Sequence, residues 1–117
     1  MPNKFISYLF ALILIGAGIM HFVSPTFYFA MIPAVFPPFV TVYVSGIVEI
    51  LLGVGLLLPR YKSLAAFGTL VLMVLFLPVH VWDYLKDAPA IGSHLVAGIR
   101  ILIQFVLIFL AWRIRRM

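Results

Sequence analysis

Long apolar stretches separated by short polar breaks dominate the pattern of hydrophobic and polar positions along this chain. Four of them approach the length of about 20 apolar residues that a helix needs to cross a bilayer. They cover residues 5–23, 39–58, 64–81 and 95–112. The breaks between them hold most of the prolines, and the breaks together with the two chain ends hold most of the charges. The pattern therefore predicts an all-α membrane protein, a bundle of four transmembrane helices in one domain of residues 1–117.

Composition supports this class and excludes a soluble domain. Hydrophobic residues make up 66% of the chain and charged residues only 9%, whereas soluble domains carry about 25% charged residues. The net charge of +5 comes mostly from basic residues that flank the apolar stretches, so it does not indicate a nucleic-acid partner. The chain contains no cysteine, which excludes disulfide and thiolate chemistry.

The basic residues also predict the orientation of the chain. Lys4, Arg60, Lys62 and the arginines of residues 113–116 fall on one side of the predicted bundle, and Lys86 falls in a loop on the other. The positive-inside rule then places both termini in the cytoplasm. We expect a multi-pass protein of the cytoplasmic (inner) membrane, with the lipid bilayer as its first partner. The basic start also resembles a signal peptide, but the apolar run is long for one and no clear cleavage site follows.

The first loop, residues 24–38, is unusual for a connector. It contains four prolines and four aromatic residues and no charge. A solvated loop is more polar, so we expect a short interfacial or re-entrant segment packed on the bundle. The alternative is an apolar connector with no further role.

Polar and ionisable residues inside the apolar stretches form the candidate ligand-binding cluster. A rise of 1.5 Å per residue places all of them in the outer half of the bilayer: His21, Glu49, His80, Arg100 and Gln104. An ionised side chain near mid-bilayer costs roughly 2.5–3.5 kcal/mol, so Glu49 needs a proton, a cation or a polar cavity. Arg100 is the expected partner, because Gln104 on the same face argues against simple snorkelling to the headgroups.

Four further residues are expected around this cluster. Gly46 and Gly53 lie three residues before and four residues after Glu49, where they either admit a neighbouring helix or leave room for a ligand. Asp83 and Tyr84 lie about one turn beyond the histidine of the third stretch, and Asp83 is placed to orient or protonate that imidazole.

Motifs for catalysis are missing from the sequence. It has no Walker or dinucleotide loop, no Ser-His-Asp arrangement and no zinc spacing, so we predict no catalytic residue, no metal site and no enzyme acting alone. Two histidines at matching depth are the pattern of bis-histidine haem proteins, but nothing else supports haem. A quinone is compatible with the cluster.

Short motifs spread over nearly the whole chain give a family resemblance. They are residues 16–22 (GAGIMHF) with Pro25, Tyr28 and Pro33, residues 45–50 (SGIVEI) with Gly53 and Pro59, and Pro78 with His80. With these the chain resembles the DoxX family of small four-helix membrane proteins. The resemblance implies a link to redox physiology, since some relatives are subunits of quinone-linked sulfur-oxidising complexes, and it implies roles for His21, Glu49 and His80.

Three functions compete on this reading. The first is a membrane subunit that binds a quinone-like or lipid-like molecule from the outer half, alone, with redox-complex subunits or as a homo-oligomer. The second is an assembly or scaffold factor for a larger membrane complex. The third is a small proton-coupled multidrug exporter, although such exporters carry their glutamate in the first span and have balanced loop charges.

Overall fold

The computed structural model describes residues 2–86 and 93–116, and the regular secondary structure of these residues is entirely helical. The elements are α1 (Pro2–Val23), the 3₁₀ helix η1 (Pro25–Met31), α2 (Pro38–Leu57), α3 (Lys62–Leu85) and α4 (His94–Arg115). The prediction of an all-α chain with four long apolar helices is confirmed. Each of the four is long and apolar enough to cross a membrane.

Local sequence explains where these helices begin and end. Pro38 opens α2 at a first-turn position, where a missing N–H costs nothing, and Pro59 follows soon after its end. Ser93 caps α4, its Oγ accepting a hydrogen bond from the N–H of Val96 at 3.4 Å. Helix α3 continues to Leu85, so Asp83 lies in its last turn and not in the break between the predicted stretches 64–81 and 95–112. Residues 87–92 of that break lie outside the described residues.

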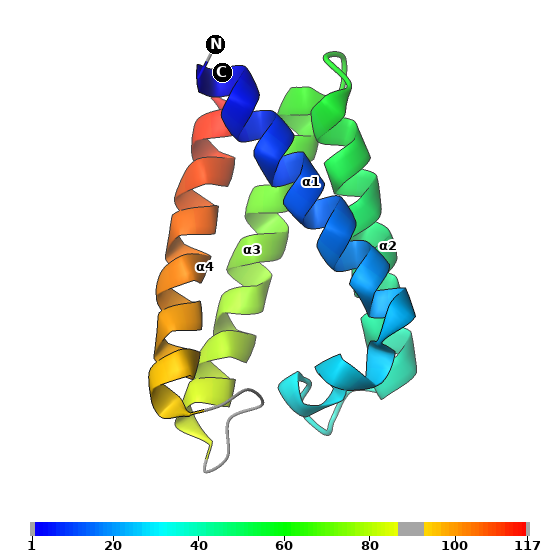
Figure 1. Cartoon of the computed structure of the whole chain (residues 1–117), viewed down its shortest axis with the longest axis vertical. Coiled ribbons are helices and arrows are strands. Elements are labelled where there is room, and N and C mark those ends of the chain that lie inside the picture. The colour runs from blue at the N-terminus through cyan, green and yellow to red at the C-terminus, as the bar shows by residue number, and fades with distance from the viewer. Residues whose placement is uncertain (1, 87–92, 117) are drawn as a thin grey trace.

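The long helices pair as two antiparallel hairpins, α1 with α2 and α3 with α4 (Figure 1). Helices α2 and α3 also contact each other, whereas α1 and α4 contact each other little. The two termini and the α2–α3 turn lie at one end of the molecule (Figure 1). This end is called the terminal end below. The opposite end carries η1, the end of α3 and the start of α4.

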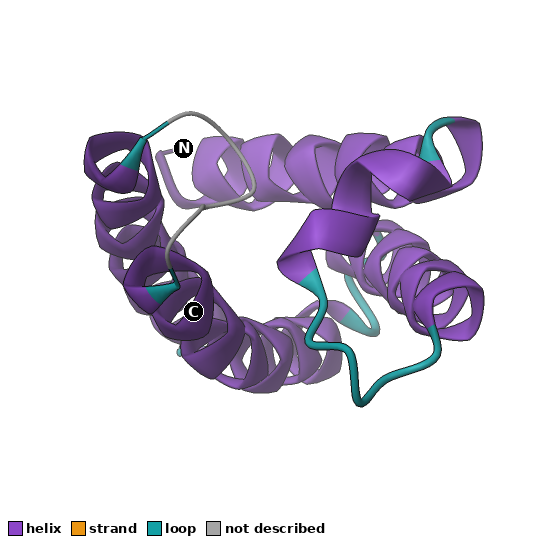
Figure 2. Ribbon diagram, turned by 90° about the horizontal axis from the view of Figure 1, so that it is seen from below, coloured by secondary structure: helices purple, strands orange, loops and turns teal. Residues whose placement is uncertain are grey.

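The apolar core lies toward the terminal end. Its buried members come from all four long helices: Phe10, Ala11, Leu14, Leu56, Ala65, Ala66, Met73, Ala111 and Ile114. Toward the other end the two hairpins diverge (Figure 1), and η1 lies across the opening between them (Figure 2). Helix η1 contacts α1, α2 and α3, so the predicted packing of the first loop on the bundle is confirmed.

Glycines allow α1 and α2 to approach backbone to backbone. A Cβ added at Gly18 would lie 2.7 Å from the carbonyl oxygen of Gly46, and one added at Gly53 would lie 2.9 Å from that of Ala11. A Cβ at Gly46 would lie 2.8 Å from the Cβ of His21. Gly46 and Gly53 therefore face α1 and serve helix packing, and the seam they form fixes the position of His21.

Large apolar side chains cover the outside of the bundle. One leucine from each long helix illustrates this, with exposed fractions of 63% for Leu12, 66% for Leu51, 64% for Leu75 and 66% for Leu102. Apolar cover of this extent on every helix is far beyond the few hundred Å² of contiguous patch that a monomeric soluble protein exposes.

Candidate functional site

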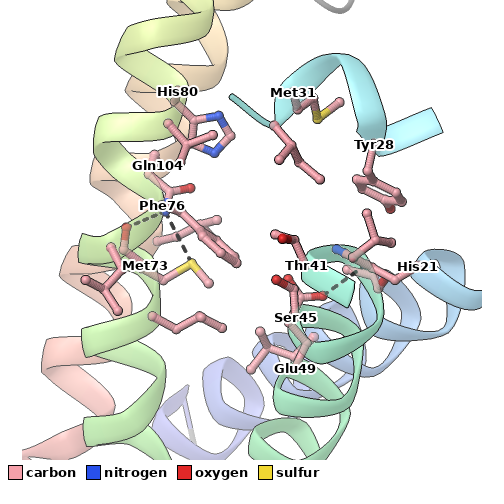
Figure 3. Close-up of a pocket in the computed structure, with 18 of the residues that line it drawn as sticks. His21, Tyr28, Met31, Thr41, Ser45, Glu49, Met73, Phe76, His80 and Gln104 are labelled. Atoms are coloured by element: carbon pink, nitrogen blue, oxygen red, sulfur yellow. Dashed lines mark hydrogen bonds and ion pairs between the residues drawn. The ribbon is translucent and has the colours of Figure 1, made fainter. Parts of the chain in front are cut away.

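A cavity of about 470 Å³ lies between the two hairpins, at the end where they diverge. This volume falls within the range of about 300–1,000 Å³ typical of small-molecule sites. Apolar side chains form most of its wall. The structure brings the whole predicted cluster to this cavity, which is lined by His21, Glu49, His80, Arg100 and Gln104. Figure 3 shows the α2 side and the α3 side facing each other across it.

Glu49 is the buried acceptor of the α2 wall. It is 5% exposed, and its Oε2 atom has no hydrogen-bond partner in the part of the chain that the structure describes. Ser45 and Thr41 lie one and two turns before it on the same helix and line the same wall (Figure 3). Because an unsatisfied buried acceptor costs about 1–3 kcal/mol, and more when charged, this carboxyl group is the most costly feature of the cavity.

His21 is close to Glu49 but does not donate a hydrogen bond to its carboxyl group. Its Nδ1 atom lies 2.6 Å from the carbonyl oxygen of Ala17, so the hydrogen on Nδ1 is donated within α1. The same nitrogen is 3.5 Å from Glu49 Oε2, a close contact without a hydrogen bond. The imidazole stacks on Tyr28 of η1, with ring centroids 4.0 Å apart and an angle of 16° between the planes.

Arg100 does not pair with Glu49, and that prediction is wrong. Its Nη1 donates to Asp83 Oδ2 at 3.1 Å, and its Nη2 contacts His80 Nδ1 and the sulfur of Met31, each at 3.3 Å. Arg100 belongs to the α3–α4 hairpin and Glu49 to the α1–α2 hairpin, and the cavity separates the two. The arginine is therefore neutralised by Asp83 on its own hairpin.

Asp83 is the carboxylate that organises the α3–α4 wall. It is 1% exposed and accepts from Lys86 Nζ at 3.1 Å as well as from Arg100. Lys86 also donates to the carbonyl oxygen of Ala30 in η1, so the same cluster holds η1 to α3. Arg100 contacts both Asp83 and His80 and so links the two residues.

The hydrogen bond from Arg100 also fixes the form of His80. Arginine only donates, so His80 Nδ1 accepts and its hydrogen lies on Nε2, which makes the imidazole neutral. Gln104 Nε2 donates to the carbonyl oxygen of Met73 at 2.6 Å, one turn before Pro78, whose missing N–H weakens this part of α3. Gln104 therefore ties α4 to α3 next to Val74, whose carbonyl loses its helical donor at Pro78.

Tyr84 lies away from the cavity lining. Its ring packs edge-on against His94, with centroids 6.0 Å apart.

Four residues that line the cavity were not predicted from the sequence: Thr41, Ser45, Tyr28 and Met31. Thr41 and Ser45 repeat at the four-residue spacing of one helix face that leads to Glu49, a signal that was available. The two η1 residues gave none, because no periodic pattern links that segment to the long helices.

Electrostatics link η1 to the α2 wall. Burial, and after it the negative charge of Glu49, raises the pKa of the Tyr28 phenol above its ordinary value of 10. Tyr28 therefore stays a neutral hydroxyl at the rim of the cavity.

No set of three metal-ligating side chains comes together within residues 2–86 and 93–116.

Comparison with known proteins identifies a family. The model of a family described as "Domain of unknown function (DUF8561)" matches residues 10–115. No curated protein and no solved structure matches the chain. The predicted resemblance to the DoxX family is therefore wrong. Its motifs combine small residues, proline and histidine in apolar helices, and membrane helices in general use small residues for close packing, so such motifs do not distinguish families.

Proposed function

Because the chain belongs to the DUF8561 family, whose description assigns no activity, we propose its function from the site: it is an integral membrane protein that binds a small amphipathic ligand in the cavity between its hairpins. The ligand is a quinone-like or lipid-like molecule that presents a hydrogen-bond donor to Glu49. It enters from the outer half of the bilayer.

Membrane embedding is supported by the surface of the bundle. All four long helices have the length and apolarity of membrane spans, and their outward faces carry exposed leucines that lipid would cover. The basic residues outside the helix interiors gather at the terminal end, with Lys86 at the other. By the positive-inside rule we place both termini in the cytoplasm and the cavity in the outer half of the cytoplasmic membrane.

The absence of cysteine makes this orientation simple to test. Single cysteines at Lys62 and at Ser93, on opposite ends of the bundle, are treated with a membrane-impermeant maleimide in intact spheroplasts. The Ser93→Cys chain is expected to react at once, and the Lys62→Cys chain only after permeabilisation. The reverse order would contradict the orientation, and equal reaction of both would contradict membrane spanning.

The observation that carries ligand binding is Glu49, a buried carboxyl group that lines a largely apolar cavity and whose Oε2 atom finds no hydrogen-bond donor among the described residues. A carboxylate in that position is stabilised when a ligand hydroxyl donates to it, and the apolar walls take up the ligand's hydrocarbon part. Hydrogen bonds to charged groups contribute about 1.5–3 kcal/mol, against about 0.5–1.5 kcal/mol for neutral pairs. Replacing the carboxylate by an amide therefore weakens binding roughly tenfold.

The test measures thermal unfolding of the protein in lipid nanodiscs with a phenol probe. 4-Heptylphenol is expected to raise the Tm more than heptylbenzene, which has no donor. This increase in Tm is expected to be smaller in the variants Glu49→Gln and His21→Ala. It should be unchanged in the control variant His94→Ala, because His94 lies outside the cavity lining. If Glu49→Gln and His21→Ala keep the full gain, the site does not bind through these residues. Purification with a stable partner and no ligand effect would favour the scaffold function instead.

A further inference from the structure

The two sides of the cavity have opposite hydrogen-bonding character. On the α2 side, the cavity is lined by Glu49, a carboxylate acceptor whose Oε2 atom has no donor within residues 2–86 and 93–116. On the α3–α4 side, Arg100 offers only donors. Figure 3 shows the α2 residues and the α3–α4 residues lining opposite sides of the same space. A ligand with one polar group would form a hydrogen bond with either Glu49 or Arg100 and leave the other residue without a ligand partner.

The donors of the α3–α4 side are incompletely used. Arg100 Nη1 is taken by Asp83, and one contact of Nη2 goes to His80. The other contact of Nη2 is the thioether sulfur of Met31 at 3.3 Å, and thioether sulfur is a weak acceptor. A ligand oxygen in place of this sulfur would form a charge-assisted hydrogen bond, the stronger kind.

From these two observations, and resting on the proposed function, we propose that the ligand has two polar ends and bridges the hairpins. A hydroxyl at one end donates to Glu49, and a carbonyl oxygen at the other accepts from Arg100. Its body between and beyond these groups is apolar. The donor is a hydroxyl and not an ammonium group, because moving a charge from water into such a cavity costs far more than moving a hydroxyl.

The experiment compares three probes of equal carbon number in nanodiscs by titration calorimetry. The first, 4′-hydroxyheptanophenone, carries both groups; 4-heptylphenol carries only the hydroxyl, and heptanophenone only the carbonyl. On the unaltered protein the first probe is expected to bind roughly tenfold more tightly than either of the others, the factor that one additional good hydrogen bond provides.

Two variants assign each end of the probe. Glu49→Gln is expected to weaken the two hydroxyl probes and leave heptanophenone unchanged. Arg100→Gln is expected to weaken the two carbonyl probes and leave 4-heptylphenol unchanged, while Asp83 keeps Lys86 as a partner. Since the three probes are first compared on the unaltered protein, a variant that folds poorly does not decide the result.

The outcomes separate this inference from the function on which it rests. If 4-heptylphenol binds as tightly as the two-ended probe and still responds to Glu49→Gln, the bridging ligand is overturned and the Glu49 site stands. If none of the hydroxyl probes responds to Glu49→Gln, or none of the three binds, both are overturned.

Discussion

The contact between α1 and α2 gives the sharpest prediction for stability, through two glycines of the same helix. Gly18 faces α2, where an added Cβ would lie 2.6 Å from Ile50 Cγ1 and 2.7 Å from the carbonyl oxygen of Gly46. Gly16, two residues earlier, has nothing within 4 Å of an added Cβ. Both variants therefore add one methyl group: Gly18→Ala adds it inside the close contact between α1 and α2, and Gly16→Ala adds it where no atom lies within 4 Å.

The magnitude follows from the difference between the two variants. Alanine in place of glycine within a helix gains about 0.5–1 kcal/mol from reduced chain entropy, and both variants receive this gain. The gain cancels in the comparison, which leaves the cost of overpacking at Gly18. Ordinary contact begins at 3.4 Å, and the neighbour at 2.7 Å is backbone, so the two helices must move apart. Overpacking of this kind costs about 1–3 kcal/mol, and we expect the variants to differ by that amount.

The assay is reversible unfolding in dodecyl maltoside micelles titrated with sodium dodecyl sulfate and followed by far-ultraviolet circular dichroism. Gly16→Ala should unfold at or slightly above the detergent fraction of the unaltered chain, and Gly18→Ala clearly below it. Equal midpoints for the two variants would refute the close backbone contact between α1 and α2.

Three further predictions concern groups around the cavity. Asp83→Asn should cost about 3 kcal/mol because it removes a carboxylate that is 1% exposed and pairs with two cations, Arg100 and Lys86. Lys86→Gln should cost at most about 1 kcal/mol because the lysine side chain is 23% exposed. Equal losses in the same titration would contradict the cluster. Gln104→Leu should cost about 1 kcal/mol, the size of one interhelical hydrogen bond in a bundle of this kind, and an unchanged midpoint would show that the bond is not formed. The pKa of Tyr28 is raised in the folded state, so the phenol contributes fully to stability below pH 10, and this contribution is lost as the pH rises through the folded-state pKa. Tyr28→Phe should remove this loss of stability at high pH. Glu49→Gln should lower the pKa of the phenol, as measured by an ultraviolet difference titration.

The sequence was sufficient to predict the four long helices but not their exact ends. The third stretch was predicted at residues 64–81, whereas the helix runs from Lys62 to Leu85, because polar residues at the end of a span can be helical without being apolar. Hydropathy therefore left Asp83 outside the predicted stretch. Its place in the last turn of α3 depends on a cation from α4, which no window of consecutive residues can reveal.

Residue spacing predicted that the polar residues of the four spans lie near one another, but it did not predict how they pair. Glu49, Arg100 and the two histidines do line one cavity. The direction in which each side chain points depends on how the hairpins pack. Arg100 and Glu49 lie in separate hairpins with a cavity between them, so the pair expected from depth alone does not form, and Asp83 takes the place of Glu49.

The uneven packing of the molecule has a consequence for how the chain can vary. Close contacts that hold the four helices together lie toward the terminal end, around Leu14, Leu56 and Ile114. The cavity lies at the other end, where the hairpins have already separated. Phe10, Leu14 and Met73 nevertheless belong to the core and also line the cavity, so substitutions there change the folding free energy together with the shape of the site. Wall residues outside the core, such as Thr41 and Ser45, are the positions where related proteins can vary the ligand while their thermodynamic stability stays nearly constant.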